Sequence, residues 1–217
     1  AVEPMDVDFL RQEMPEAISQ TTDGVRRISE IVRAMKEFSH PGAAGFSLVD
    51  INHSLENAVT VSRNEWKYVA DIETDLDSSL PLVPCLATQL NQAILNILVN
   101  AAQAIGESVN KGLSNRGKIV IATRKDEASV VIRISDTGPG IPDKIRDRVF
   151  EPFFTTKDVG KGTGQGLTIA YDVVTRLHHG KLSFDSKAGE GTVFRIELPL
   201  VQPEPPIVEP PDTEPQH

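Results

Sequence analysis

The sequence predicts an α/β fold, a two-layer sandwich of strands and helices, preceded by a long N-terminal helix. Segments 118–125 and 129–135 are rich in Val and Ile and are typical of paired strands, whereas segment 86–107 repeats its apolar residues at helical spacing. At the N-terminus, apolar residues recur every seven positions, as in a coiled coil. The predicted parts are residues 1–41, 42–200 and 201–217.

Each element of the sandwich follows from a local signal. Leu90, Ile94 and Ile97 share one face of the long helix, and a polar turn at 126–128 joins the two central strands. Pro142 begins a short helix. The remaining expected elements are a strand at 46–50, a helix at 51–63, a strand at 68–76, a helix at 166–177, and strands at 181–186 and 192–198.

The N-terminal helix is predicted from its apolar repeat. Ile18, Val25 and Val32 are seven residues apart, and charged side chains occupy the other faces. Pro41 should end the helix, because proline cannot continue one. Such a stripe predicts packing against partner helices, the alternative being a helix that packs only against its own domain.

The composition excludes several classes of function. The chain has 217 residues and a net charge of −9, from 22 basic and 31 acidic residues, and no basic stripe is interleaved with aromatic residues. Nucleic acid is therefore not an expected partner. No apolar run approaches the roughly 20 residues of a membrane helix, and the single cysteine, Cys85, fits a reducing cytoplasm. The acidic, proline-rich segment 202–217 is typical of a solvated linker or a frayed terminus.

Three segments together specify a nucleotide pocket. Asn96 and Asn100 lie on the long helix, Asp136 follows a strand, and the glycine-rich run 162–166 opens a later helix. A buried amide can hold a metal, an aspartate at a strand end can accept a hydrogen bond from a purine amine, and glycines let backbone N–H groups approach phosphates. The spacing of the glycines matches neither a Rossmann nor a Walker A loop.

In order and spacing, these segments resemble the catalytic, ATP-binding domain of sensor histidine kinases, whose superfamily also contains gyrase-type, Hsp90-type and MutL-type ATPases. The likeness runs from about Phe46 to Leu200 and implies a Bergerat-type fold. In this fold a mixed sheet backs three helices, and the nucleotide lies between the helices and a mobile lid. The matching boxes are the N box at 96–105, the first glycine box at 136–141, the F box at 150–157, the second glycine box at 162–167 and the closing segment 189–194.

The resemblance implies ATP and Mg²⁺ as cofactors and a role for each box. Asn100 would offer its amide oxygen to Mg²⁺, unless it only bridges buried backbone. Asp136 would accept from the adenine amino group, which favours ATP over GTP, unless it is only a turn residue. Thr192 would join Asp136 through a water. The other expected ATP contacts are Gly138, Gly140, Lys157, Lys161, Gly162, Gly164, Gly166 and Leu167.

Asn96 decides between phosphoryl transfer and hydrolysis. Gyrase-like members carry a glutamate four residues before the metal-binding Asn, and this glutamate activates water. An amide cannot act as a general base, so we expect a protein-histidine kinase in which Asn96 and Asn100 are the catalytic residues. The chain departs from the family at Gln103. Many members have a basic residue at this position, three after the metal-binding Asn, and its contact with phosphate is in doubt here.

The histidines do not supply a phosphate acceptor of the expected kind. Kinase acceptor histidines are followed by an acidic residue, and His40, His53, His178, His179 and His217 are not. The N-terminal helix within residues 1–41 resembles the second helix of the dimerisation and phosphotransfer hairpin of these kinases, whose first helix carries the acceptor histidine. We expect a fragment that begins after this first helix and that dimerises through its N-terminal helix when the hairpin is complete. The phosphate would be relayed to a response-regulator receiver domain. It would be cytoplasmic, or the cytoplasmic part of a membrane-anchored sensor. The alternatives are a hydrolytic conformational ATPase and a non-catalytic nucleotide-binding scaffold. The pair His178-His179 is expected to end a helix, with Gly180 at its C′ position.

Overall fold

The structure, a computed structural model, describes residues 14, 15, 17–19, 21, 22, 25, 45–110, 112, 115–156 and 164–202. The expected ATP contacts Lys157, Lys161 and Gly162 lie outside the described residues, as do most of the predicted N-terminal helix and the tail after Gln202. The described residues between 14 and 25 are helical, and Ile18 and Val25 of the predicted stripe are each 59% exposed.

Five strands form one mixed sheet in the order β2-β4-β5-β7-β6. The first pair, β2 and β4, is parallel, and the other three pairs are antiparallel. The predicted mixed sheet is therefore confirmed. The strand bounds are Ala70–Asp75 for β2, Gly117–Lys125 for β4, Ser129–Asp136 for β5, Lys181–Lys187 for β6 and Gly191–Pro199 for β7.

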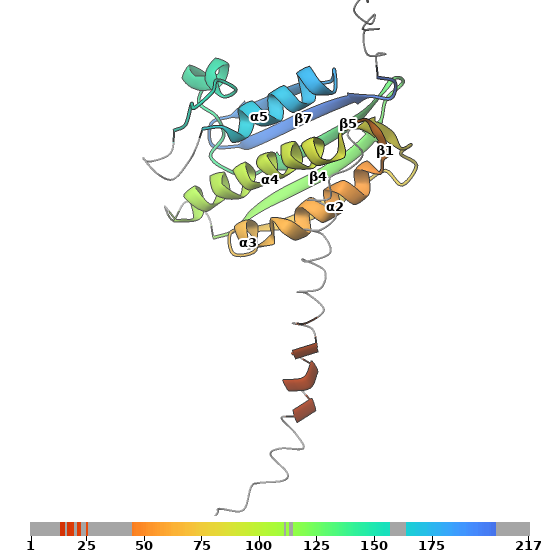
Figure 1. The fold of residues 1–217 in the computed structure, drawn as a ribbon. Coiled ribbons are helices and arrows are strands. Elements are labelled where there is room, and N and C mark those ends of the chain that lie inside the picture. Colours follow the sequence, from red (N-terminus) through yellow and green to blue (C-terminus); the bar gives the residue numbers. More distant parts are fainter. Residues whose placement is uncertain are drawn as a thin grey trace, which may run out of the picture.

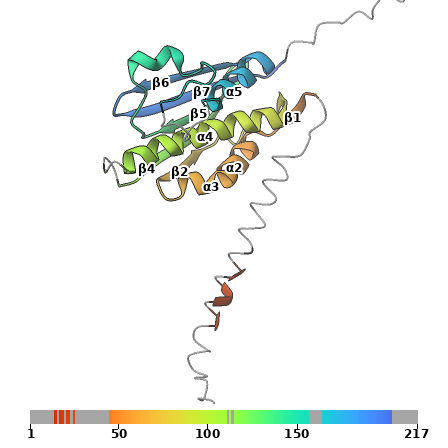
Figure 2. The same cartoon turned by 60° about the vertical axis from the view of Figure 1, so that its left-hand side comes forward.

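The helices cover one face of this sheet, which confirms the predicted two-layer sandwich (Figure 1). The long helix α4 crosses the middle of the sheet between α2 and α5, and the short α3 follows α2, as the turned view also shows (Figure 2). The opposite face of the sheet is left open by the described helices. The helix bounds are Ile51–Val61 for α2, Arg63–Trp66 for α3, Ala87–Asn110 for α4 and Gly166–Asp172 for α5.

The core lies between α4 and the sheet. Leu90, Ile94 and Ile97 on α4 are fully buried, as predicted from their spacing, and they lie in one apolar cluster with strand residues such as Ile121 and Ile132. Burying each such side chain contributes about 1.5–3 kcal/mol. Within the described part of the chain, no helix has both the length and the apolar content that crossing a membrane requires.

Two strands form a separate small sheet beside the start of α4. β1 (Ser47–Val49) pairs antiparallel with β3 (Val83–Cys85). The sequence predicted the first strand but not the second, because three residues that include Pro84 carry no alternating pattern. The small sheet buries Val83 and Cys85 and holds the start of the domain against the beginning of α4.

The end of α5 also differs from the expected helix end. A π-helical turn, Val173–Leu177, continues α5, and the buried side chain of His178 closes it. The residue in the left-handed region is His179, with φ of 52°, and not Gly180. Gly180 is needed for a different reason, because a Cβ there would lie 2.3 Å from the carbonyl oxygen of Glu197.

Ion pairs tie the edge strand β2 to its neighbour β4. The carboxylates of Asp71, Glu73 and Asp75 alternate along β2 and point to the open face of the sheet. Each lies within ion-pair distance of a basic residue on or just before β4. The partners are Arg116 for Asp71, Lys118 for Glu73 and Arg124 for Asp75.

A buried hydroxyl links the sheet to α2 and to the loop after β2. Thr123 is fully buried; its Oγ1 donates to Asn52 Oδ1 at 2.9 Å and accepts from the Asp77 N–H at 2.9 Å. Asn52 in turn donates from Nδ2 to the Asp77 carbonyl at 2.9 Å. The three residues thus satisfy one another in a site that the core otherwise surrounds with apolar atoms.

Replacing Thr123 with Val should lower the free energy of unfolding by about 1–2 kcal/mol, because it leaves the half-buried Asp77 N–H and Asn52 amide oxygen without their partner. Urea unfolding monitored by circular dichroism measures the change. Thr74→Val, the same change at an exposed position on β2, is the control and should alter stability by less than about 0.5 kcal/mol. Equal effects at the two positions would contradict the role given to the Thr123 hydroxyl.

Candidate nucleotide-binding site

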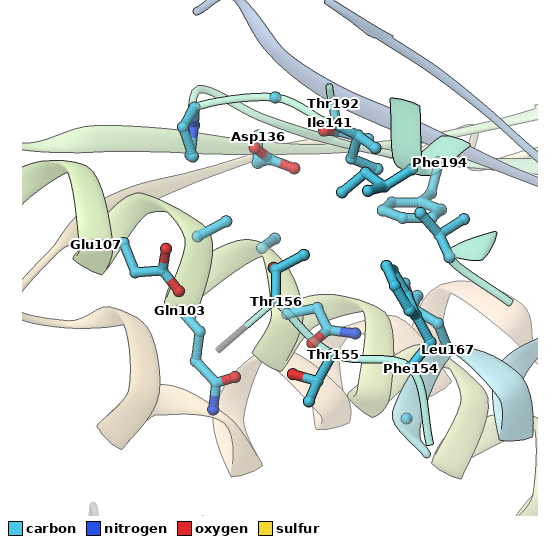
Figure 3. Close-up of a pocket in the computed structure, with 18 of the residues that line it drawn as sticks. Gln103, Glu107, Asp136, Ile141, Phe154, Thr155, Thr156, Leu167, Thr192 and Phe194 are labelled. Atoms are coloured by element: carbon cyan, nitrogen blue, oxygen red, sulfur yellow. The ribbon is translucent and has the colours of Figure 1, made fainter. Parts of the chain in front are cut away.

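A pocket of about 860 Å³ opens between α4, the end of β5 and the start of α5. Figure 3 shows Asp136, Thr192 and Phe194 on its sheet side and Gln103 and Glu107 on α4 across from them. Eight of the expected site residues line the pocket. They are Asn96, Asn100, Asp136, Gly140, Gly164, Gly166, Leu167 and Thr192.

Asp136 ends β5 with its carboxylate buried against the pocket. Only 7% of the residue is exposed, and the backbone N–H groups of Gly138 and Thr192 donate to the carboxylate, the first at 2.8 Å. Burial raises the pKa of Asp136 to about 6, and these two N–H groups oppose the rise. The result is a strong, fixed hydrogen-bond acceptor at the closed end of the pocket.

The two glycines of the first glycine box are required by contacts within the protein. A Cβ at Gly138 would lie 2.8 Å from Asp136 Oδ1 and 3.1 Å from the Ala104 Cβ. Gly140 has φ of 70°, and a Cβ there would lie 2.2 Å from the Lys187 carbonyl oxygen. Gly140 lines the pocket, whereas Gly138 is not among the lining residues and lies behind Asp136.

Two amides of α4 face the beginning of α5. Asn96 and Asn100 are one turn apart, and a Cβ built at Gly166 would lie 3.7 Å from Asn96 Cγ and from Asn100 Nδ2. The Nδ2 of Asn96 is buried and has no hydrogen-bond partner among the described residues. A buried, unpartnered N–H donor beside a helix start is suited to an acceptor oxygen of a ligand.

Thr192 contributes from the neighbouring strand. It lies opposite Asp136 in the β5–β7 register and is 5% exposed. Its N–H donates to the Asp136 carboxylate, while its hydroxyl is 2.9 Å from the Ser186 hydroxyl. Thr192 therefore positions Asp136 directly through its backbone.

The three phenylalanines before the glycine-rich run have different surroundings. Phe150 packs against the rings of Tyr171 and Phe184, with centroids 4.8 and 5.8 Å away, and so anchors this segment to the domain. Phe154 lines the pocket. Phe153 is 72% exposed and has φ of 63°. Its backbone lies so close to Gly164 that a Cβ there would be 2.4 Å from the Phe153 carbonyl carbon.

Several lining residues were not predicted from the sequence. Gln103 and Glu107 continue the stripe of Asn96 and Asn100 along α4, so helical spacing could have indicated them. Phe194 lies two residues after Thr192 on β7 and faces the same side of the sheet. Ile141, Thr155 and Thr156 belong to the first glycine box and the F box, but no contact was predicted for them individually. Lys144 lies on the 3-10 helix Asp143–Arg148, and no sequence signal indicated it.

Comparison with known families identifies the class of protein. Residues 85–202 match the model of the histidine kinase-, DNA gyrase B- and HSP90-like ATPases. The chain belongs to this family, and the resemblance drawn from the boxes is confirmed. Its α/β sandwich is an ATP-binding domain of the histidine kinase type.

Relatives with assigned functions are sensor kinases. The chain is 32% identical to the sensor kinase CckA of Brucella abortus over 200 residues, which are 84% of this chain and 20% of that protein. It is 31% identical to the histidine-protein kinase AtoS of Escherichia coli over 201 residues, which are 89% of this chain and 31% of AtoS. The chain therefore spans about a fifth to a third of the length of these curated relatives.

Solved structures share the fold. The catalytic domain of histidine kinase ThkA is 27% identical, with a TM-score of 0.61 over 71% of this chain and 95% of that one. The mycobacterial sensor histidine kinase MprB is 28% identical, with a TM-score of 0.59 over 71% of this chain and 97% of that one. Both are histidine kinases, in agreement with the family match.

Asp136→Asn should stabilise the protein without nucleotide at pH 7.5. The folded pKa of about 6 lies above the ordinary 3.8, so burying the ionised carboxylate costs stability. The protonated carboxyl group therefore makes its full contribution to the free energy of unfolding below pH 3.8, and this contribution is lost as the pH rises through 6. Relative to the wild type, the free energy of unfolding of the variant should therefore be about 1–2 kcal/mol higher at pH 7.5 and almost unchanged near pH 4.

Urea unfolding at the two pH values measures this difference. Asp185→Asn, which neutralises an exposed carboxylate on β6, is the matched control and should change stability by less than about 0.5 kcal/mol at either pH. A gain at Asp136 that is the same at both pH values would contradict the assigned cause.

Proposed function

We propose that this chain is the ATP-binding catalytic part of a sensor histidine kinase of a two-component system. It binds Mg-ATP and transfers the γ-phosphoryl group to a histidine outside this sequence, and the phosphoryl group then passes to an aspartate of a response regulator. Family membership supports ATP binding, and the amide at position 96, where hydrolytic members carry a glutamate, supports transfer over hydrolysis.

The observation that carries this proposal is the buried, unpartnered Nδ2 of Asn96. Hydrolytic members of the superfamily have a glutamate at this position, which takes a proton from water. In this chain the group offered is an N–H donor, which can hold a phosphate oxygen but cannot deprotonate water. Phosphate would be held in place until another nucleophile arrives.

The nucleotide fits the two ends of the pocket. At the closed end, the Asp136 carboxylate would accept from the adenine amino group, with Gly138 and Thr192 fixing its position. A guanine would present a carbonyl oxygen there, so two acceptors would face each other. At the open end, the start of α5 and the amides of α4 would meet the phosphates.

The residues present also fit Mg²⁺ bound together with nucleotide. Asn100 offers an amide oxygen, and Mg²⁺ commonly takes one or two protein oxygens while phosphates and waters complete its shell. Among the described residues, no group of three or more His, Cys, Asp or Glu side chains could hold a metal by itself. When bound, the ion would neutralise charge on the phosphates, and Asn100 would be the residue that holds it.

The transfer step exchanges one bond to phosphorus for another. The bond between the γ-phosphorus and the bridging oxygen breaks, ADP leaves, and a bond forms to a nitrogen of the acceptor imidazole, whose ring proton passes to a base supplied with it. Such a step depends mainly on positioning and charge neutralisation. Asn96, Asn100 and the start of α5 would supply the positioning, and Mg²⁺ held by Asn100 would supply the charge neutralisation.

The proposed partners follow from the same family. A structure of histidine kinase ThkA in complex with the response regulator TrrA shares this fold, with a TM-score of 0.60 at 24% identity. We propose a receiver domain as the partner of this chain and a homodimer formed through the N-terminal helix, whose described apolar residues Ile18 and Val25 are exposed.

Calorimetry with Mg-ATP and Mg-GTP tests the pocket. ATP should bind, and GTP should bind at least about tenfold more weakly, because its carbonyl would oppose the buried acceptor. Asp136→Asn should weaken ATP binding by about tenfold or more, whereas Asp185→Asn should leave it unchanged. Equal affinities for the two nucleotides would remove the role of Asp136, and absent binding would favour the scaffold alternative.

A phosphoryl-transfer assay separates the kinase from a hydrolytic ATPase. With labelled Mg-ATP and a dimerisation hairpin of a related kinase supplied in trans, label should appear on the hairpin in an acid-labile form. The chain alone should release almost no phosphate. Asn100→Ala should abolish transfer and should make ATP affinity nearly independent of Mg²⁺. Rapid phosphate release by the chain alone, without label on any histidine, would establish the hydrolytic alternative instead.

A further inference from the structure

His178 joins three segments that are distant in sequence. Its Nε2 accepts a hydrogen bond from the Leu86 N–H at 2.9 Å, and its Nδ1 is 2.8 Å from the Val173 carbonyl oxygen. Its ring meets Phe46 edge-on, with centroids 5.6 Å apart and an angle of 74° between the planes. The side chain is fully buried. It therefore connects the beginning of α4, the end of α5 and the start of the domain.

The partners define the chemical state of this ring. A carbonyl oxygen can only accept, so Nδ1 carries the proton; the Leu86 N–H can only donate, so Nε2 is unprotonated. Both nitrogens are satisfied by one neutral tautomer. Burial lowers the pKa of His178, which agrees with a neutral ring in the folded protein.

The bond to Leu86 caps α4 from outside the helix. Most helices satisfy their first N–H groups with a Ser, Thr, Asp or Asn of the same segment. Leu86 directly precedes α4, and its carbonyl accepts the bond from Leu90 that opens the helix. Its own N–H is satisfied by a side chain 92 residues further along the chain. An apolar residue at position 178 could fill the same space but could not hold the two helices in register.

The nucleotide pocket lies at the start of α5 and along the middle and later part of α4. Gly166, at the start of α5, lies against Asn96 and Asn100 of α4 and is 12 residues before His178, which is roughly 18 Å along a helix. Because a helix transmits a rotation along its length, the bond at one end of α5 influences the contact between Gly166 and the two amides at the other. This contact borders the pocket in which the phosphates would lie.

Phe46 brings the preceding chain into this arrangement. It is the residue before β1, it is 44% exposed, and its ring edge rests on His178. A movement of the segment that enters the domain at Phe46 would therefore act first on the ring that holds α4 and α5 together. Leu48, two residues further along on β1, is 68% exposed and serves as a comparison position.

We propose that His178 is a positioning residue that couples the start of the domain at Phe46 to the nucleotide pocket, by fixing the end of α5 to the beginning of α4. Its imidazole does not contact the nucleotide. It sets the separation of α4 and α5, which contact the nucleotide. Because Phe46 packs on its ring, nucleotide affinity responds to the position of Phe46. This inference rests on the proposed function, because nucleotide affinity is its readout.

Two substitutions divide the hydrogen bonds of His178. His178→Gln can place an amide oxygen near the Nε2 position and keep the Leu86 bond, whereas His178→Asn can keep only the bond to Val173. In calorimetry on the full 217-residue chain, the Asn variant should bind Mg-ATP about fivefold more weakly or worse, and the Gln variant should stay within about twofold of the wild type. Thermal melts by circular dichroism identify a temperature at which every variant is folded.

Phe46→Ala tests the other half of the coupling. It should weaken Mg-ATP binding by a similar factor, whereas Leu48→Ala should not. In the double variant of Phe46→Ala and His178→Asn, the fold-loss of Mg-ATP affinity should be smaller than the product of the two single fold-losses. Should Asn at position 178 prevent folding, Phe46→Ala and His178→Gln carry the test, and unchanged affinity in Phe46→Ala overturns the inference.

The outcomes separate this inference from the proposed function. A wild-type chain that fails to bind ATP would defeat the proposed function itself. A wild-type chain that binds ATP, with a folded His178→Asn variant that binds it equally well but melts at a lower temperature, would leave the proposed function intact. In that case His178 would be structural only, and the coupling would be refuted.

Discussion

The arrangement of α4 determines most of this structure, because one face of this helix packs in the core and another lines the pocket. One face is apolar and is buried against the sheet, where Leu90, Ile94 and Ile97 form the centre of the core. A second stripe carries polar side chains and lines the pocket. This stripe consists of Asn96, Asn100, Gln103 and Glu107. The packing that stabilises the fold thereby also fixes the rotation of α4 about its axis, which decides where the polar stripe points.

Periodic elements were predictable from the sequence, and elements set by contacts were not. The spacing on α4 and the Val and Ile of β4 and β5 predicted helix and strands within a few residues, because each is long enough to show its period. β3 has three residues, and the π-helical turn after α5 shares its composition with an α-helix. Neither has a local signal that separates it from its neighbours.

The site was predictable to a similar degree. Boxes with fixed spacing pointed to Asn96, Asn100 and Asp136, and all three line one pocket. The reasons for the glycines were less accessible, because they depend on atoms far away in sequence: Gly140 makes room for the Lys187 carbonyl and Gly164 for the backbone of Phe153. Lys144, on the 3-10 helix Asp143–Arg148, reaches the pocket only through the path of the chain around it, which no local pattern encodes.

The charged rows at the margins of the sheet have a consequence for how the domain behaves in a crowded solution. Unpaired backbone groups at a sheet edge invite another strand to add. At one margin, β2 presents the ion-paired carboxylates of Asp71, Glu73 and Asp75, and at the other, β6 presents exposed Lys181 and Lys187. A strand that approached either margin would have to dehydrate these charges. The domain can therefore be held at high local concentration without polymerising edge to edge.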